Sequence, residues 1–402
     1  MLTVTEALAA IVDETHRLAA ARVSLVDSMG LVLAADADSD LDSPPFDKAL
    51  MDGYAVRTAD ANRPETQLRV IDEVLAGQVS QLAVGPGDAI RIMTGAPLPA
   101  GSDAVVPVER TRLEEDGHNQ TVVIVNPLGI TVGRNILKRG ESSRQGTRVV
   151  PAGRRLRAQE IGALAELGQA EVAVYPAPRV AVLATGDELV PVEQVPGPGQ
   201  IRNSNESMLA AQMRQMGAVP VPLGVARDNA ADLRLRIDKG LSHDVLLLAG
   251  GVSAGKLDLV PSVLAEAGVR QVFHKVLVKP GQPIWFGVRG PCYVFGLPGN
   301  PVSSMVCCEL FVRAAIRKLQ GIEPAVPKPL RGRLTREHFN AGNRPMYHPA
   351  RWEWTEQGGS VELVKWVGSA DLAATVEANA LAVFAEGDRK YSAGSMIDVL
   401  LF

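Results

Sequence analysis

Uninterrupted hydrophobic runs alternate with amphipathic segments between residues 178 and 322. The runs RVAVLAT, VPVPLGV, DVLLLAG, VFHKVLV and CYVFGL are typical of strands that are buried on both faces of a sheet. The segments ESMLAAQMRQMG, NAADLRLRIDKG and LVPSVLAEAG have helical character, and a glycine closes each of them. This alternation predicts a mainly parallel α/β sheet with helices on both sides.

The flanking regions follow other patterns. Residues 1–175 start with an amphipathic helical segment, continue with short alternating runs such as TVVIVNP, and end with a second helix at 157–168. The Pro-rich stretch 321–332 indicates a linker. The sequence therefore predicts a multidomain α/β plus β fold. Its expected parts are an N-terminal linker and β-rich module (1–175), a central α/β domain (178–322) and a small C-terminal β domain (331–402).

Composition narrows the range of partners. The 402 residues are 46% hydrophobic and 21% charged with a net charge of −4, so nothing indicates binding to nucleic acid. No apolar stretch approaches the roughly 20 residues that a membrane helix needs, so we expect no membrane partner. The first residues are typical of an amphipathic helix rather than a signal peptide, and the three cysteines form no C-x-x-C pair, so we expect a cytoplasmic protein. The six scattered histidines argue against a zinc site.

The segment DVLLLAGGVSAGKLDLVPSVL (244–264) places an apolar run, a glycine-rich turn and a helical segment in succession. Residues 251–255 match the G-x-S-x-G nucleophile elbow of α/β-hydrolases, which also need an acid and then a histidine later in the chain. His274 follows too soon, and His338 and His348 fall in a different predicted domain. A serine hydrolase that uses Ser253 is therefore a minor alternative.

The same turn matches the P-loop pattern from Gly250 to Lys256, but Leu257 stands where a Ser or Thr would bind Mg²⁺. A nucleotide triphosphatase is therefore equally disfavoured. Both motifs share one physical feature, because the N–H groups of a glycine-rich turn at a helix N-terminus can hold an anion. LPGNPVSS repeats it, with Asn300 as a candidate cap and Pro301 at the first helical position.

Because two such turns occur in one predicted sheet, binding of a phosphate-bearing ligand explains their composition as well as plain helix capping does. The candidate binding residues in the two turns are Gly250, Gly251, Ser253, Gly255, Pro298, Gly299, Asn300 and Pro301.

Carboxylates follow the same strand ends. Asp187 and Glu188 end one predicted strand, and Asp228 and Asp258 open helical segments. Each acid alone is explained by the macrodipole of a helix. Together on one rim of the sheet they can hold Mg²⁺, which prefers carboxylates and ligand phosphates.

Two lysines, Lys275 and Lys279, lie four residues apart on one predicted strand, so we expect them to share a face that holds a dianion. Two further segments, SPPFDKALMDGYAVR (43–57) and RIMTGAPLPAGSDAVVPVE (91–109), are not explained by periodicity. The first sets Asp52 beside a glycine in an otherwise apolar run.

The strings PPFD…MDGYA, RIMTGAPLPAGSDAVV, NILKRGE, VLATGDEL, GGVSAGKLD, VKPGQP and GLPGNPVSS follow one another in this order. In this order they resemble the molybdopterin molybdenumtransferase family, the bacterial MoeA type that also occurs as the gephyrin E domain. The resemblance covers essentially the whole chain. It implies insertion of molybdenum from molybdate into adenylylated molybdopterin, with help from Mg²⁺ and release of AMP.

The resemblance also implies a homodimer whose cleft joins the central domain of one subunit to the N-terminal region of the other. A molybdopterin adenylyltransferase is a further expected partner, because it would deliver the substrate. The glycine-rich turn then becomes a cradle for pterin phosphate or nucleotide, and Ser253 attacks nothing. The implied roles are anion binding by Lys275, Lys279 and Arg344, positioning of Mg²⁺ or substrate by Glu188, Asp228 and Asp258, entry of Asp52 and Thr94 from the partner subunit, and a contribution of Ser369 from the last domain.

Three positions depart from the family pattern. Ser142 stands where many relatives carry an acid, Lys256 stands where an acid is common, and Gln282 replaces a usual lysine. The last two changes alter the charge in opposite senses. The missing acid at Ser142 slightly favours an alternative, a pterin-binding paralogue without turnover, whereas the retained carboxylates argue for the enzyme.

Overall fold

The computed structural model describes residues 1–252 and 259–402. They form two compact units, and the expectation of a multidomain α/β protein is confirmed. The region 1–175, which we expected to contain a linker and a β-rich module, contributes to both units. The first unit consists of Met1–Ala35, Gly153–Arg157 and Glu171–Phe402, and the second of Asp36–Ala152 and Ala158–Ala170.

A six-stranded sheet forms the centre of the first unit. The first four strands in the sheet order are parallel, and the last two are antiparallel to their neighbours. The apolar runs at 179–185 and 292–297 form strands with the expected bounds. The order is β18 (Val219–Ala226), β15 (Arg179–Thr185), β19 (Val245–Ala249), β23 (Cys292–Leu297), β22 (Trp285–Arg289) and β20 (Arg270–His274).

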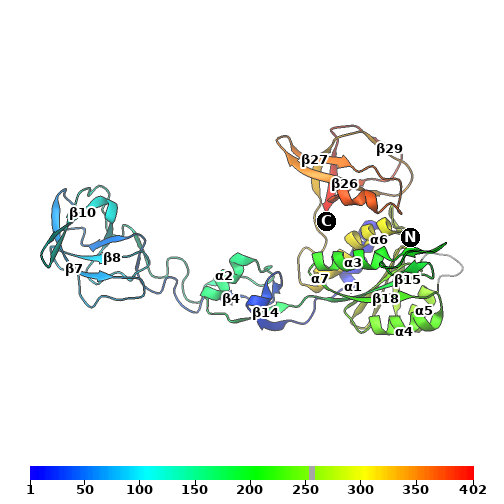
Figure 1. The fold of residues 1–402 in the computed structure, drawn as a ribbon, viewed down its shortest axis with the longest axis horizontal. Helices are drawn as coiled ribbons and strands as arrows, with labels where there is room; N and C mark the ends of the chain where they lie inside the picture. The colour runs from blue at the N-terminus through cyan, green and yellow to red at the C-terminus, as the bar shows by residue number, and fades with distance from the viewer. Residues whose placement is uncertain (253–258) are drawn as a thin grey trace. The chain divides into compact units, whose positions relative to one another are not determined.

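Helices cover both faces of this sheet (Figure 1). Val180 and Val182 of β15 pack in one core, and Ala181 and Leu183 in the other, as expected for a strand buried on both faces. The first core includes α1 (Val4–Glu14), α3 (Ser204–Gln215), α6 (Pro301–Cys307) and α7 (Arg313–Leu319), and the second includes α4 (Ala230–Gly240) and α5 (Val260–Glu266).

The C-terminal region of the same unit is a closed five-stranded barrel with its own apolar core. Short strand pairs complete the unit, including β1 (Leu2–Thr3) with β21 (Val276–Leu277) and β16 (Leu189–Val190) with β17 (Ile201–Arg202). The barrel order is β24 (Leu330–Leu334), β27 (Gly358–Leu363), β26 (Met346–Thr355), β28 (Ala380–Phe384) and β30 (Met396–Leu401). The remaining strands are β2 (Ala21–Ser24), β14 (Glu171–Tyr175), β3 (Val32–Leu33), β25 (His338–Asn340) and β29 (Arg389–Tyr391).

The second unit is built on another six-stranded sheet, in which only β7 and β8 pair in parallel. Strand β6, next to the edge strand β9, begins at Gly53 directly after Asp52, so the MDGYA string marks a strand start. The sheet order is β10 (Thr111–Asp116), β11 (Asn119–Ile124), β7 (Thr66–Val74), β8 (Asp88–Ile92), β6 (Gly53–Val56) and β9 (Ala104–Pro107). The unit also contains β4 (Ala37–Asp38), β13 (Arg148–Val150), β5 (Lys48–Ala49), β12 (Ile136–Leu137) and α2 (Ala158–Glu166).

Candidate active-site cleft

A cleft of about 780 Å³ lies at the carboxyl ends of β15, β19 and β23. Ligands of α/β sheets bind at such an edge because the connecting turns leave main-chain groups free there. The cleft brings together eight residues that the sequence nominated. They are Glu188, Asp228, Gly250, Gly251, Pro298, Gly299, Asn300 and Pro301.

The turn after β19 depends on two consecutive glycines. Gly250 and Gly251 have φ values of +101° and +65°, a region that other residues seldom adopt. A Cβ atom on either residue would also lie 3.0 Å or less from Oγ1 of Thr185. The glycines therefore let the turn approach the end of β15 closely and leave its main chain open to the cleft.

The second turn precedes α6, and Asn300 occupies its N-cap position with Pro301 at the first helical position. The expected cap position is therefore confirmed, but the Asn300 side chain makes no capping hydrogen bond. Its Nδ2 donates instead to Oγ of Ser369 at 2.9 Å. The main-chain carbonyl of Ser369 accepts from the N–H of Val302 at 3.0 Å, so the C-terminal domain caps this helix.

Two carboxylates line the cleft at the end of β15 and before α4. Glu188 and Asp228 are both exposed, and the N–H of Asp228 donates to Oδ1 of Asp187 at 3.3 Å. Among the described residues no group of three or more metal-binding side chains occurs. Two carboxylates still fit Mg²⁺, which commonly takes one or two from the protein and the rest of its ligands from water and substrate phosphates.

The two lysines do not lie on one strand, and the prediction that they share a strand face was wrong. β20 ends at His274 and β21 begins at Val276, because Lys275 between them has a φ of +69°. The N–H of Lys279 donates to the carbonyl of Pro345 in the C-terminal region at 2.9 Å.

Arg344 is held by residues on both sides of Lys279. Its Nη1 donates to Oε1 of Gln282 at 2.9 Å and to the carbonyl of Val278 at 3.4 Å. Gln282 is therefore a hydrogen-bond acceptor of this arginine. Lys275, Lys279 and Arg344 are absent from the described residues that line the cleft.

Asp52 and Thr94 form a tight pair in the second unit. Both the N–H and the hydroxyl of Thr94 donate to Oδ1 of Asp52 at 2.7 Å. These hydrogen bonds, first the one from the main chain and then the one from the hydroxyl, lower the pKa of the Asp52 carboxyl. The pair is exposed to solvent, so it presents a fixed negative charge at the surface of this unit.

Comparison with known proteins covers the whole chain. The MoeA N-terminal region (domain I and II) matches residues 2–168, the "Probable molybdopterin binding domain" matches 181–318, and the MoeA C-terminal region (domain IV) matches 331–402. A molybdopterin molybdenumtransferase from Staphylococcus aureus (strain N315) is 33% identical over 412 residues, which is 100% of this chain and 95% of that protein. The chain belongs to the molybdopterin molybdenumtransferase family.

Other relatives agree with this assignment. A molybdopterin molybdenumtransferase from Nostoc sp. is 35% identical over 395 residues, which is 94% of this chain and 88% of the relative. The crystal structure of the molybdopterin biosynthesis MoeA protein from Pyrococcus horikoshii OT3 matches with a TM-score of 0.82 and 27% identity over 100% of both chains. The comparisons do not support the hydrolase alternative for this family member.

Some expected site residues lie outside the described part of this MoeA-family chain. They are Ser253, Gly255 and Asp258, together with the departure Lys256. The histidines considered for a hydrolase are absent from the described residues that line the cleft. His274 donates through Nε2 to the carbonyl of Val252 at 3.1 Å, and burial lowers the pKa of both His338 and His348.

The cleft also contains residues that the sequence reasoning missed. Thr185, Arg202 and Asn205 line it, as do Asn203 and Ser204 at the start of α3. Asn203 caps this helix by accepting from the N–H of Glu206. The pattern N-S-N-E was an available signal, because Asn followed three residues later by Glu is a helix-start pattern.

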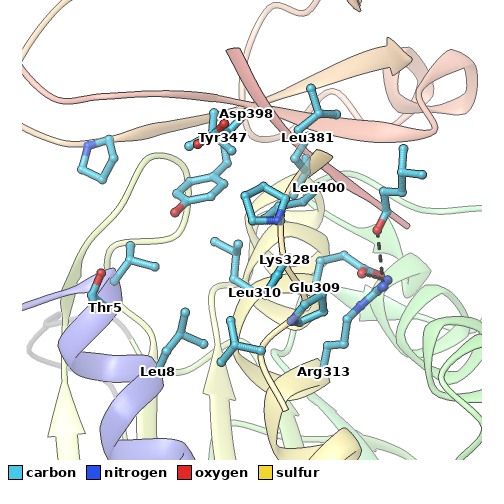
Figure 2. Close-up of a pocket in the computed structure, with 18 of the residues that line it drawn as sticks. Thr5, Leu8, Glu309, Leu310, Arg313, Lys328, Tyr347, Leu381, Asp398 and Leu400 are labelled. Atoms are coloured by element: carbon cyan, nitrogen blue, oxygen red, sulfur yellow. Dashed lines mark hydrogen bonds and ion pairs between the residues drawn. The ribbon is translucent and has the colours of Figure 1, made fainter. Parts of the chain in front are cut away.

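A second cavity of about 810 Å³ lies between α1, the helix that ends in α7, and the C-terminal barrel (Figure 2). Leu8, Leu310 and Leu400 are among its apolar residues, and the ion pair of Glu309 and Arg313 lies at its edge. It contains none of the predicted site residues. No helix of the described residues is long and apolar enough to cross a membrane.

Proposed function

We propose that this protein inserts molybdenum from molybdate into adenylylated molybdopterin, with release of AMP, during the synthesis of molybdenum cofactor. Its family membership supports the reaction class. The observation that carries the site assignment is the cleft where two glycine-containing turns face Glu188 and Asp228. A ligand with a phosphate-bearing tail and a bound divalent cation matches that combination of main-chain donors and carboxylates.

The reaction brings two anions together, molybdate and the pyrophosphate group of the substrate, so positive charge must offset their repulsion. Arg202 and the N-terminus of α3, which line the cleft, are suited to the phosphate side. We assign the anion-binding role at molybdate to Lys275, Lys279 and Arg344, as the family resemblance implies. No protein nucleophile is required.

Mg²⁺ is the proposed cofactor. Glu188 and Asp228 would hold it together with Asp258, and it would supply positive charge to the phosphate oxygens when bound. The protein's own contribution is to bind and orient the two anions and to screen their repulsion. Asn300 and Ser369 join the cleft to the C-terminal domain through their hydrogen bond.

We also propose a cytoplasmic homodimer in which Asp52 and Thr94 enter the cleft from the partner subunit, and an encounter with the adenylyltransferase that supplies the substrate. The exposed, ionised Asp52 supports a role toward a ligand or cation. Light scattering at several protein concentrations tests the dimer. Mixing two inactive variants, Asp52→Ala and Glu188→Ala, should restore part of the activity, because one cleft of the mixed dimer would be intact.

The decisive test uses purified protein with adenylylated molybdopterin, molybdate and Mg²⁺. AMP release and active molybdenum cofactor are measured together, and both should depend on molybdate. Glu188→Gln should reduce AMP release strongly and raise the Mg²⁺ concentration required. Tight substrate binding without AMP release would instead identify a binding paralogue, and Ser142 would then be the first position to restore to an acid.

A further inference from the structure

Two polar atoms at the cleft have no hydrogen-bond partner within the described part of the chain. They are Oγ1 of Thr185 and Oδ1 of Asn205. Both residues line the cleft, and the side chain of Thr185 is almost completely buried, at 4% exposure. Buried polar atoms in folded proteins nearly always have a partner, so a pair of exceptions at one ligand-sized cleft needs an explanation.

The orientation of the Asn205 amide is fixed by its neighbour. Its Nδ2 donates to the main-chain carbonyl of Gly299 at 2.8 Å, and a carbonyl oxygen can only accept. The nitrogen must therefore face Gly299, which leaves Oδ1 as the free atom. Oδ1 is an acceptor, so only an N–H or O–H group can satisfy it.

The Thr185 hydroxyl lies against the double-glycine turn at the same edge of the sheet. A Cβ atom on Gly250 or Gly251 would lie 3.0 or 2.9 Å from Oγ1, so any larger residue would close over the hydroxyl. The turns are adjacent, because a Cβ atom on Gly299 would lie 3.8 Å from Cα of Gly250. Because these residues are glycines, no Cβ atom of theirs fills the space beside the Thr185 hydroxyl.

We infer that Thr185 and Asn205 form a subsite for an uncharged hydrogen-bond donor edge of the ligand. Asn205 accepts a ligand N–H or O–H, and the Thr185 hydroxyl donates to or accepts from the adjacent ligand atom. Neither side chain is charged, so this subsite is distinct in chemistry from the anion-binding residues. The inference rests on the proposed function, and the donor belongs either to the pterin ring or to the nucleotide of the substrate.

Thr185→Val is the most direct test, because it preserves the shape of the side chain and removes only the hydroxyl. The chain offers a matched control in Thr15, whose Oγ1 is also buried without a partner in the described structure but which does not line the cleft. Asn205→Leu has a similar control in Asn340, whose Nδ2 also donates to a main-chain carbonyl while Oδ1 has no described partner. Thr185→Ser keeps the hydroxyl and should behave as wild type.

Calorimetric titration of the full-length protein with adenylylated molybdopterin, molybdopterin and AMP gives the readout. Thr185→Val should weaken binding of adenylylated molybdopterin about 2- to 10-fold, the range for one neutral hydrogen bond. Its Tm should equal or exceed that of wild type, because the variant removes a buried polar atom without a partner. The controls Thr15→Val and Asn340→Leu should bind as wild type.

The smaller probes identify the source of the donor. If the variants weaken the binding of molybdopterin but not of AMP, the subsite belongs to the pterin. If they weaken the binding of AMP but not of molybdopterin, it belongs to the nucleotide. Wild-type affinity of both Thr185→Val and Asn205→Leu for all three probes would overturn the subsite and leave the proposed function intact. Failure of the wild-type protein to bind any probe would overturn the proposed function itself.

Discussion

Gly53→Ala is expected to destabilise the second unit, because no space exists for the added methyl group. β6 lies between β8 and β9, and a Cβ atom on Gly53 would lie 2.0 Å from the main-chain oxygen of Val106 in β9. Contacts of a Cβ atom below 3.0 Å are essentially never seen. The two strands would have to separate by roughly 1 Å at this point, and their paired hydrogen bonds would lengthen.

The magnitude follows from two contributions. Overpacking of a tight interior costs about 1–3 kcal/mol, and weakening of one buried backbone hydrogen bond adds about 0.5–1.5 kcal/mol. We therefore expect the free energy of unfolding of this unit to fall by about 2–4 kcal/mol. Gly162→Ala is the matched control in the same unit. It lies inside α2 with no atom within 4 Å of its added Cβ, so it should stabilise by about 0.5–1 kcal/mol.

Hydrogen exchange with mass spectrometry locates the effect. Amides of β6 and β9 should exchange faster in Gly53→Ala, whereas β15 and β19 in the other unit should not change. Tryptophan fluorescence is a further control, because all four tryptophans lie in that other unit: Trp285, Trp352, Trp354 and Trp366. Gly53→Ala with wild-type exchange in β6 would refute the steric argument.

Three further predictions concern charge. The hydrogen bonds from Thr94 lower the pKa of Asp52, so the ratio of wild-type to Asp52→Asn AMP release should stay constant from pH 8 down to about 4, where an ordinary Asp is half protonated. A ratio that falls toward one near pH 4 would contradict the lowered pKa. Burial lowers the pKa of His348, so the unfolded state binds this proton at a higher pH than the folded state does. The Tm should therefore fall as the pH drops below about 6.5. His348→Gln should flatten this decline, and an equal dependence of Tm on pH in wild type and variant would show that His348 is not responsible. Gln282→Glu should raise the KM for molybdate about two- to fivefold, because the new carboxylate would pair with Arg344, whereas Gln282→Lys should lower the KM. A KM change of the same sign in both variants would contradict a role of Arg344 in anion binding.

The central sheet was predictable because its strands are buried on both faces and therefore lack polar interruptions. β15 and β23 begin and end where the apolar runs do. The break at Lys275 was not predictable, since a positive φ at a lysine is set by the tertiary structure and not by local preference. Residues 1–35 belong to the first unit because Ala7 and Ile11 of α1 pack in the core of that unit. Their partners there lie far along the chain, so this placement was not predictable from local sequence.

The candidate site was predictable to the extent that it consists of turns at strand ends. Glycines and acids that follow apolar strands are visible in the sequence, and the parallel sheet brings them to one edge. Thr185 and Asn205 were missed because a polar side chain shows no sign in the sequence of whether it has a partner. The side chain of Asn300 was misjudged for the same reason, since Ser369 reaches it from a different domain.

Glycines serve two different physical purposes at Gly53 and at Gly250 and Gly251. At Gly53 the missing side chain lets two strands of a sheet lie against each other, and the adjacent Asp52 is fixed because its carbonyl accepts from the N–H of Val108 at 3.1 Å. At Gly250 and Gly251 the missing side chains leave space beside the hydroxyl of the buried Thr185. Alanine at Gly53 should therefore reduce stability and activity together, whereas alanine at Gly251 should reduce ligand affinity through loss of space at Thr185 as well as strain at a positive φ. The first glycine of the G-x-S-x-G string thus has a role that does not involve the serine, because it leaves space beside the Thr185 hydroxyl.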